Sequence, residues 1–262
     1  MFSGTSRELR PLDYAGLLDL ALSLWSKNLP LFTSISAAVY VPIALLHMVA
    51  LFLHPVGFPL PTFRLELNQP LIWSAAQMLT LLAPFLLSVA TTAATTALLL
   101  GQQPTLSGII GTVVRRIGPA ALTALLVTVL TLAGLWCFVV PGLLVALACV
   151  FAPQVLLLEH KSSKDALSRS AGLVLAQRQW IRVVVMGVIV GLLIWVGDLL
   201  VSSAVELVSP NNTFGVGMRV LGADIFTLAT TPFTMIATTL LYIDIRVRLE
   251  DYDDGALASE VG

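Results

Sequence analysis

Six apolar runs, separated by short polar or amphipathic stretches, dominate the pattern of hydrophobic and polar positions along this chain. A membrane-spanning helix needs about 20 predominantly apolar residues, and each run is close to that length or longer. The pattern therefore predicts an all-α integral membrane protein with six transmembrane helices, forming one polytopic domain over residues 1–262. The predicted spans are residues 29–53, 71–100, 117–138, 140–158, 181–207 and 220–245.

Two short motifs predict how some of these spans meet. Pro141 and Gly142 stand at the junction of the third and fourth spans and leave no room for a domain between them, which predicts a tight hairpin there. Gly187 and Gly191 in the fifth span have the small-xxx-small spacing that lets two helix backbones approach closely.

A short amphipathic stretch precedes each odd-numbered span. Residues 12–28, 105–116 and 163–180 each place apolar side chains at helical spacing opposite a polar face, as Tyr14 and Leu18 do in the first. These helices are too short to span a bilayer and too polar on one face to be immersed in it. We therefore expect three cytoplasmic interfacial helices, and the chain suggests a threefold repeat of one surface helix plus two spans.

Composition and charge support this class. The chain is 57% hydrophobic and 11% charged, about half the charge of an ordinary soluble domain. With the predicted spans in place, only Arg64 and Arg219 of the 14 Lys and Arg residues fall on the outer side. The others fall on one side: Arg7, Arg10, Lys27, Arg115, Arg116, Lys161, Lys164, Arg169, Arg178, Arg182, Arg246 and Arg248. The positive-inside rule then predicts a multi-pass protein of the bacterial cytoplasmic membrane with both termini in the cytoplasm.

Parts of the chain resemble a known family. The segment Leu17 to Leu29 before the first span is similar to the entry motif of the membrane domain attached to some bacterial glycerophosphodiester phosphodiesterases, and of stand-alone relatives. Pro141-Gly142, Glu159 at the end of the fourth span and the exit Leu241 to Glu250 also match that domain. The resemblance implies a membrane domain without an established activity of its own. The catalytic barrel of those phosphodiesterases has no counterpart here, because no soluble α/β stretch is present.

Signatures of enzymatic chemistry are missing from the sequence. It contains no Gly-x-Ser-x-Gly elbow, no His-Glu-x-x-His and no phosphate loop. Cys137 and Cys149 both lie in apolar runs, where a small buried residue is more common than a disulfide. We expect no enzyme, no cofactor and no metal site, and nothing in the charge distribution indicates nucleic acid.

The first candidate site is an intramembrane polar set made of Asp198, Glu206, Arg219 and Asp224. At about 1.5 Å per residue, Asp198 and Asp224 lie roughly 13 Å and 6 Å below the outer ends of their spans. Together with Arg219 they could form a proton or cation site. The alternative is a structural Asp–Arg pair that pins two helices, with Asp198 held protonated by its apolar surroundings.

Two smaller features in the spans allow a functional and a structural interpretation. His47 is ionisable, and such residues in spans are often functional, although a neutral imidazole that bonds a neighbouring helix or reaches the outer interface is the favoured explanation. Threonines and serines form stripes on two spans, which could line a polar path or simply bond their own backbone and pack closely. The stripes are Thr227, Thr231, Thr234 and Thr238 on the sixth span, and Ser88, Thr91 or Thr92, and Thr95 on the second.

The second candidate site is cytoplasmic and comprises Glu159, Asp244, Arg246 and Arg248, where two spans leave the membrane. These residues could form an ion-pair network that locks the fourth and sixth spans. They could equally bind a soluble partner or an anionic lipid headgroup.

The sequence thus favours a non-enzymatic membrane component that binds membrane lipids or another membrane protein or protein complex. The alternative is a transporter or flippase for a small or lipidic solute, with an intramembrane hydrolase a distant third. A wide water-accessible cavity between the second, fifth and sixth spans would favour transport, and a sealed bundle would favour binding.

Overall fold

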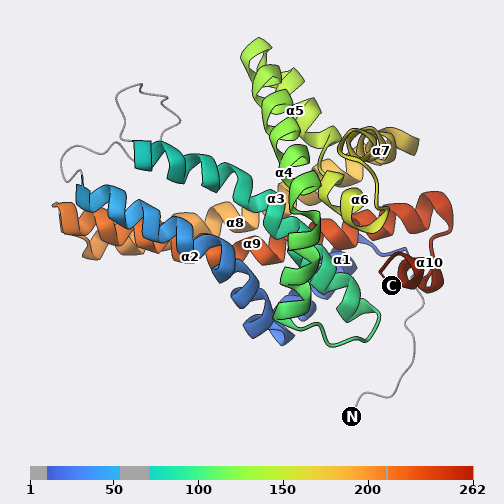
Figure 1. Cartoon of the computed structure of the whole chain (residues 1–262), viewed down its shortest axis with the longest axis horizontal. Helices are drawn as coiled ribbons and strands as arrows, with labels where there is room; N and C mark the ends of the chain where they lie inside the picture. The colour runs from blue at the N-terminus through green and yellow to red at the C-terminus, as the bar shows by residue number, and fades with distance from the viewer. Residues whose placement is uncertain (1–10, 54–70, 211, 262) are drawn as a thin grey trace.

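A computed structural model describes residues 11–53, 71–210 and 212–261, and every element in these ranges is a helix (Figure 1). The elements are α1 (Tyr14–Lys27), α2 (Leu29–Leu53), α3 (Leu71–Leu99), α4 (Leu106–Cys137), α5 (Val139–Ala148), α6 (Ala152–Leu158), α7 (Ser163–Leu175), the 3₁₀ turn η1 (Ala176–Arg178), α8 (Trp180–Val208), α9 (Thr213–Glu250) and α10 (Asp254–Val261). The predicted all-α fold is confirmed. Arg7, Arg10, His54 and Arg64 lie outside the described residues.

Five helical segments of the described chain are long and apolar enough to cross a membrane. They are Leu29–Ala50, Leu106–Cys137, Val139–Leu158, Trp180–Val208 and Phe214–Glu250. The continuous part of α3 whose side chains the structure describes, Ala83–Leu99, is apolar but shorter. By length and composition these helices indicate a multi-pass membrane protein. The sixth span and the threefold repeat stay predictions.

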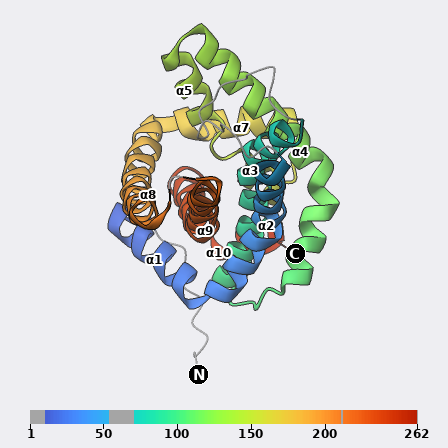
Figure 2. The same cartoon turned by 90° about the vertical axis from the view of Figure 1, so that its left-hand side faces the viewer.

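Helix α9 is the centre of the molecule. Viewed along the long axis, it lies in the middle, with α1, α2, α3 and α8 around it (Figure 2). Its second half is the most buried, because Ile236, Tyr242 and Ile245 are each fully enclosed. Helix α9 therefore joins the elements that come from both halves of the sequence.

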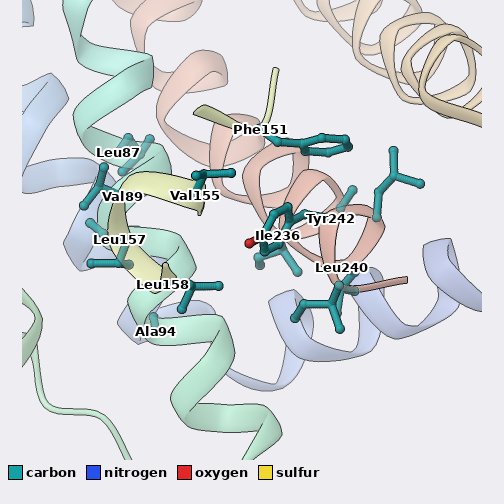
Figure 3. Packing of buried hydrophobic residues seen from close by; sticks show 14 of the residues in the cluster. Leu87, Val89, Ala94, Phe151, Val155, Leu157, Leu158, Ile236, Leu240 and Tyr242 are labelled. Atoms are coloured by element: carbon teal, nitrogen blue, oxygen red, sulfur yellow. The ribbon is translucent and has the colours of Figure 1, made fainter. Parts of the chain in front are cut away.

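Buried side chains of α3, α6 and α9 meet in one hydrophobic cluster (Figure 3). Every residue of α6 is buried. The ring of Phe151, just before α6, lies 5.7 Å from the ring of Tyr242 between centroids. Leu87 of α3 and Leu156 of α6 are fully buried in the same cluster. This cluster fixes α6 between α3 and α9.

Helix α4 differs from the expectation of an interfacial helix followed by a separate span. It runs without a break from Leu106 to Cys137, so the predicted boundary at residues 116 and 117 is absent. Thr105 caps its start by accepting from the N–H of Gly108, but no left-handed residue or other helix stop follows until Phe138. Pro119 lies inside the helix, and its missing N–H does not end it.

The hairpin between α4 and α5 turns at Phe138, whose backbone is extended (φ −166°, ψ 154°). Pro141 and Gly142 instead lie in the first turn of α5, where proline is well tolerated. Gly142 serves packing: a Cβ there would lie 2.4 Å from Leu135 Cγ, and one on Gly134 would lie 2.7 Å from Gly142 Cα. The two glycines thus let α4 and α5 touch next to the turn.

The predicted fourth span, residues 140–158, is divided into α5 and α6 by a turn over residues 149–151. Ser170 of α7 stabilises this turn from outside. Its hydroxyl donates to the Ala148 carbonyl at 2.7 Å and accepts from the Phe151 N–H at 3.1 Å. Because these partners come from a distant helix, the apolar run itself gave no sign of the break.

The α4–α5 hairpin lies crosswise to the long axis that α2, α8 and α9 follow (Figures 1 and 2). Its tip is highly exposed: Trp136 is 91% and Phe138 is 78% accessible. No charged residue occurs between Arg116 and Glu159. An uncharged arm with aromatic side chains at its tip is suited to lipid rather than to water.

The remaining predicted interfacial helices form separate elements. Helix α1 corresponds to residues 12–28 and α7 to residues 163–180, although α7 ends at Leu175 and η1 joins it to α8. In η1, Gln177 and Arg178 have positive φ angles of 43° and 61°, and the chain changes direction there between α7 and α8. At the other end of the sequence, α9 continues to Glu250 and is followed by α10, which the sequence did not predict.

Candidate functional site

Asp244 of α9 is the centre of the first polar cluster at the end of the bundle where α1 and α10 lie, which we call the network end. Its carboxylate accepts from the Leu12 N–H at 2.8 Å, from Arg182 Nη2 at 2.8 Å and from Arg248 Nε at 2.9 Å. Both arginines also donate to the Leu12 carbonyl, at 2.9 and 2.8 Å. The backbone before α1 is thereby fixed to α8 and α9.

Burial explains why Asp244 needs so many partners. Its side chain is only 3% exposed, and an ionised carboxylate removed from water is costly unless it is paired and hydrogen-bonded. Arg182 also lies over the ring of Tyr14, with its Cζ 4.9 Å from the centroid. The cluster is thus a joint between α1, α8 and α9.

Glu159, at the end of α6, is the acceptor of a second cluster. Arg169 Nε lies 3.0 Å from both of its oxygens, the Tyr242 hydroxyl donates to it at 2.9 Å, and Lys161 Nζ lies 3.4 Å away. Arg169 also pairs with Glu250. Burial lowers the pKa of Arg169, but its bonds to Glu250 and Glu159 raise that pKa more, so it stays above its ordinary value.

Arg246 connects this second cluster to the C-terminal helix. It is only 8% exposed, donates to Glu250 at 3.0 Å and to both oxygens of Glu260 at 2.9 and 2.8 Å. Its Cζ lies 3.8 Å from the ring centroid of Tyr252, whose hydroxyl donates to Glu260 at 2.6 Å. Arg246 therefore holds α10 against α9.

The structure brings the four cytoplasmic candidates to one end but divides them between two clusters. Asp244 and Arg248 belong to the first, and Glu159 and Arg246 to the second. All four have partners within the chain. The sequence did not predict the residues that complete the two clusters, which are Arg182, Arg169, Tyr242 and Glu260. One further member, Glu250, could have been found, because it follows Arg246 by four residues, the spacing of a helical ion pair.

The intramembrane candidates are not brought together as a set. Asp224 lies beside His47 of α2, with 3.3 Å between His47 Nδ1 and Asp224 Oδ2. Within the described residues no ion pair joins Arg219 to Asp198, Glu206 or Asp224, and both Asp198 and Glu206 are exposed. The Asp–Arg pair that the sequence suggested is thus not found among these residues, and the group beside Asp224 is His47. Matching the depths of His47 and Asp224 below the ends of their spans could have found it.

Asp198 lies instead on a cavity of about 680 Å³ between α8 and α9. Its walls are mostly apolar and include Met186, Ile194 and Trp195 of α8. The predicted threonine stripe of α9 forms the opposite wall, and Pro84 of α3 and Tyr40 of α2 reach it as well. The fifth and sixth predicted spans therefore form most of this cavity, and the second contributes only Pro84.

Gly187 and Gly191 also line this cavity. A Cβ on either glycine would meet nothing within 4 Å. The close approach of a second helix backbone that their spacing predicted is thus not found among the described residues. The two glycines make the cavity wider, which gives this spacing a different role.

The second serine and threonine stripe lies in the core. Thr92 Oγ1 of α3 lies 3.1 Å from Thr239 Oγ1 of α9, and Gln154 Nε2 of α6 donates to Ser88 Oγ at 3.2 Å. Thr91 bonds the carbonyl of Leu87. These side chains join buried helices and do not line the cavity of Asp198. The buried Gln154 was not among the sequence candidates.

No family model, curated protein or solved structure matches the chain. The resemblance to the phosphodiesterase-associated membrane domain therefore stays a prediction that rests on the residues quoted for it. Among the described residues no group of three or more His, Cys, Asp or Glu is arranged to hold a metal ion.

Proposed function

We propose that the protein is a non-enzymatic, lipid-binding component of the bacterial cytoplasmic membrane, with both termini in the cytoplasm. The observation that carries this proposal is the cavity between α8 and α9. A volume of about 680 Å³ falls in the range of about 300 to 1,000 Å³ that small-molecule sites occupy. In a membrane-spanning bundle the surrounding solvent is lipid, so an acyl chain is the natural occupant.

The threonine wall supports an apolar occupant. Thr230, Thr231 and Thr238 donate to backbone carbonyls of their own helix at 2.8, 2.6 and 2.8 Å. Their hydroxyls are therefore already satisfied, and what they offer to the cavity is chiefly small, methyl-bearing surface. A continuous water path would need groups with free hydrogen-bonding capacity. Around this cavity these are the exposed Asp198 of α8 and the hydroxyls of Thr227 and Thr234, for which the described residues supply no hydrogen-bond partner.

The test is to fill the cavity from its glycine side. In the variant Gly187→Leu with Gly191→Leu, the added side chains enter open space, so we expect folding to persist while tightly bound lipid is lost. Protein purified in mild detergent would be extracted and its lipid measured by mass spectrometry. Gly118→Leu is the matched control, since Gly118 on α4 also faces open space but does not line the cavity. An unchanged lipid content in the folded double variant would contradict the proposal.

Asp198 favours a second candidate, transport of a lipidic or small solute. A carboxylate on the wall of a membrane cavity is a common element of proton or cation pathways. In proteoliposomes, Asp198→Asn would abolish solute or lipid movement if the protein is a transporter. If the protein only binds lipid, neither the wild type nor the variant moves lipid faster than empty vesicles do.

Topology can be tested with thiol labelling. Cysteines at Ala258 of α10 and at Pro210, which follows α8, are both at exposed positions, and we expect an impermeant reagent to label only the Pro210 site in intact cells. Native Cys137, exposed near the hairpin tip, would be replaced by serine in these variants. Labelling of the Ala258 site from outside would overturn the proposed orientation.

Cys137 itself distinguishes two states of the hairpin. Six crossings would place it at the outer surface, whereas the crosswise hairpin of Figure 1 favours a tip within the lipid. We expect Cys137 to react with a membrane-soluble maleimide and not with an impermeant one. Reaction with the impermeant reagent from outside would instead establish the third and fourth spans as full crossings.

A further inference from the structure

A second cavity, of about 380 Å³, lies at the network end between α3, α4, α6 and α10. Its inner wall is apolar and includes Ala97, Ile109 and Leu158. Its rim carries the polar side chains of Thr112, Arg115 and His160. A cavity with an apolar wall and a basic rim has the two properties that a lipid with an anionic headgroup requires.

Two groups at the rim are hydrogen-bond donors. The Arg115 guanidinium can only donate, and the contacts of His160 leave its Nε2–H as a donor. Arg115 bonds the Gly111 carbonyl of its own helix through Nε at 3.3 Å, and among the described residues no carboxylate forms an ion pair with it. Arg116 Nη2 lies within hydrogen-bond distance of His160 Nδ1. Because a guanidinium has no acceptor, His160 Nδ1 must accept, and the ring proton then resides on Nε2.

The backbone of His160 is also unusual. Its φ angle is +52°, in the left-handed region that side-chain-bearing residues seldom adopt and that clusters at functional sites. The residue stands between α6 and α7, directly after Glu159, whose partners in the second cluster hold the turn in place. The imidazole is thus presented at the rim by a turn that the network fixes.

One carboxylate, Glu260, also lines the cavity. It does not oppose an anion strongly, because Arg246 bonds both of its oxygens and Tyr252 donates to it. Its charge is therefore matched from within the chain. Arg115 remains as the positive charge that faces a ligand, and Arg116 contributes indirectly through its contact with His160.

We propose that this cavity binds a phosphate group, carried by an anionic lipid whose glycerol part rests on the apolar wall. Arg115 pairs with the phosphate oxygens, and His160 Nε2–H donates to the same group. A guanidinium is well suited to phosphate because it offers a planar fork of donors. The site is distinct from the cavity between α8 and α9, so it does not depend on the function proposed above.

The experiment is a binding titration of purified protein in neutral detergent, followed by thermal shift and native mass spectrometry. The probes are dihexanoyl phosphatidic acid, dihexanoyl phosphatidylcholine and inorganic phosphate. We expect phosphatidic acid to bind most tightly, because phosphatidylcholine has a compensating cation and inorganic phosphate lacks the apolar part. Equal binding of phosphatidic acid and inorganic phosphate would support the anion site and assign free phosphate as its ligand.

Variants then locate the site. Arg115→Gln should weaken phosphatidic acid binding by about tenfold or more, and its melting temperature without ligand should not change, because Arg115 is exposed. Thr112→Ile fills the cavity without altering charge, so it should reduce binding of the lipid but not of inorganic phosphate. Lys164→Gln is the control, since Lys164 is an exposed basic residue of the same end that does not line the cavity.

Two results would overturn the proposal. The first is an unchanged affinity for phosphatidic acid in folded Arg115→Gln. The second is an equal loss in Arg115→Gln and Lys164→Gln, which would show diffuse attraction to a basic surface in place of a site.

Discussion

The carboxylates near the two ends of α9 differ in burial and in the number of hydrogen-bond donors around them. At the network end, Asp244 has three hydrogen-bond donors and is almost completely buried. At the other end, Asp224 has His47 beside it, and the nearby Asp198 of α8 is exposed. At about 1.5 Å per residue, Asp224 and Asp244 lie roughly 30 Å apart along α9, which is about the thickness of the hydrocarbon core.

This difference separates charged residues that stabilise the fold from charged residues that remain available for other interactions. A buried carboxylate with several donors stabilises the structure only as part of its cluster, and losing one member leaves the others unpaired. An exposed or singly paired carboxylate can be changed with little effect on folding. The two ends should therefore respond very differently to substitution, and the predictions below test that contrast.

The largest effect is expected for Asp244→Ala. The substitution leaves Arg182, Arg248 and the Leu12 N–H without their shared acceptor, so it should lower the free energy of unfolding by about 3 to 5 kcal/mol. Circular dichroism during denaturant unfolding in detergent measures this. Asp198→Ala is the control from the other end and should change stability by no more than about 0.5 kcal/mol. Similar losses in both variants would refute the contrast.

Arg246 and Arg248 provide a sharper comparison within the network end. Arg246 has a side chain 9% exposed and joins Glu250 and Glu260, whereas the side chain of Arg248 is 29% exposed. We expect Arg246→Gln to cost about 3 kcal/mol and Arg248→Gln about 1 kcal/mol. Unfolding of both variants under the same conditions decides this. Arg246→Gln should also release α10, which limited proteolysis after Tyr252 would reveal.

The positions of these two arginines show what the sequence could and could not predict. The apolar runs predicted α2, α3 and α8 to within a few residues, because length and hydropathy determine such helices. The same pattern could not distinguish Arg246 from Arg248, because both follow the last predicted span. Their different roles depend on α10 and on the backbone of Leu12, which lies 236 residues from Arg248, and no local pattern encodes such a contact.

The same reasoning explains where the structure differs from the predicted span boundaries and from the predicted polar set. The turn between α5 and α6 depends on Ser170, and the crosswise hairpin depends on packing against other helices. For the polar set near the outer ends, residue type suggested an Asp–Arg pair, but His47 of α2 is the group that faces Asp224. Which helices become neighbours is decided by tertiary packing, so pairs within one helix were more predictable than pairs between helices.

Alkaline pH tests the network end through Tyr252. Burial, and then its bond to the Glu260 carboxylate, raises the pKa of Tyr252 above its ordinary value of 10.0. Below that pH the hydroxyl is protonated in both states and its bond contributes fully. Above it the unfolded chain loses the proton first, so the free energy of unfolding falls.

Tyr252→Phe should therefore cost about 1.5 kcal/mol at neutral pH, and the gap from the wild type should narrow as the pH rises above 10.0. Comparing the two proteins isolates Tyr252 from the other tyrosines. A gap that widens with pH would show that the phenol ionises more easily in the folded protein, contrary to its buried, acceptor-facing position.

The smallest effect is expected for the pair at the other end. His47 Nδ1 of α2 lies 3.3 Å from Asp224 Oδ2 of α9, and hydrogen bonds between membrane helices contribute about 0.6 kcal/mol on average. A double-mutant cycle with His47→Ala and Asp224→Ala should give a coupling energy of that size, because the cycle removes the other interactions that each side chain makes. The corresponding cycle for Arg182 and Asp244 should give a coupling several times larger. A coupling energy for His47 and Asp224 equal to that for Arg182 and Asp244 would show that both pairs support the fold equally strongly. Both ends of α9 would then be structural.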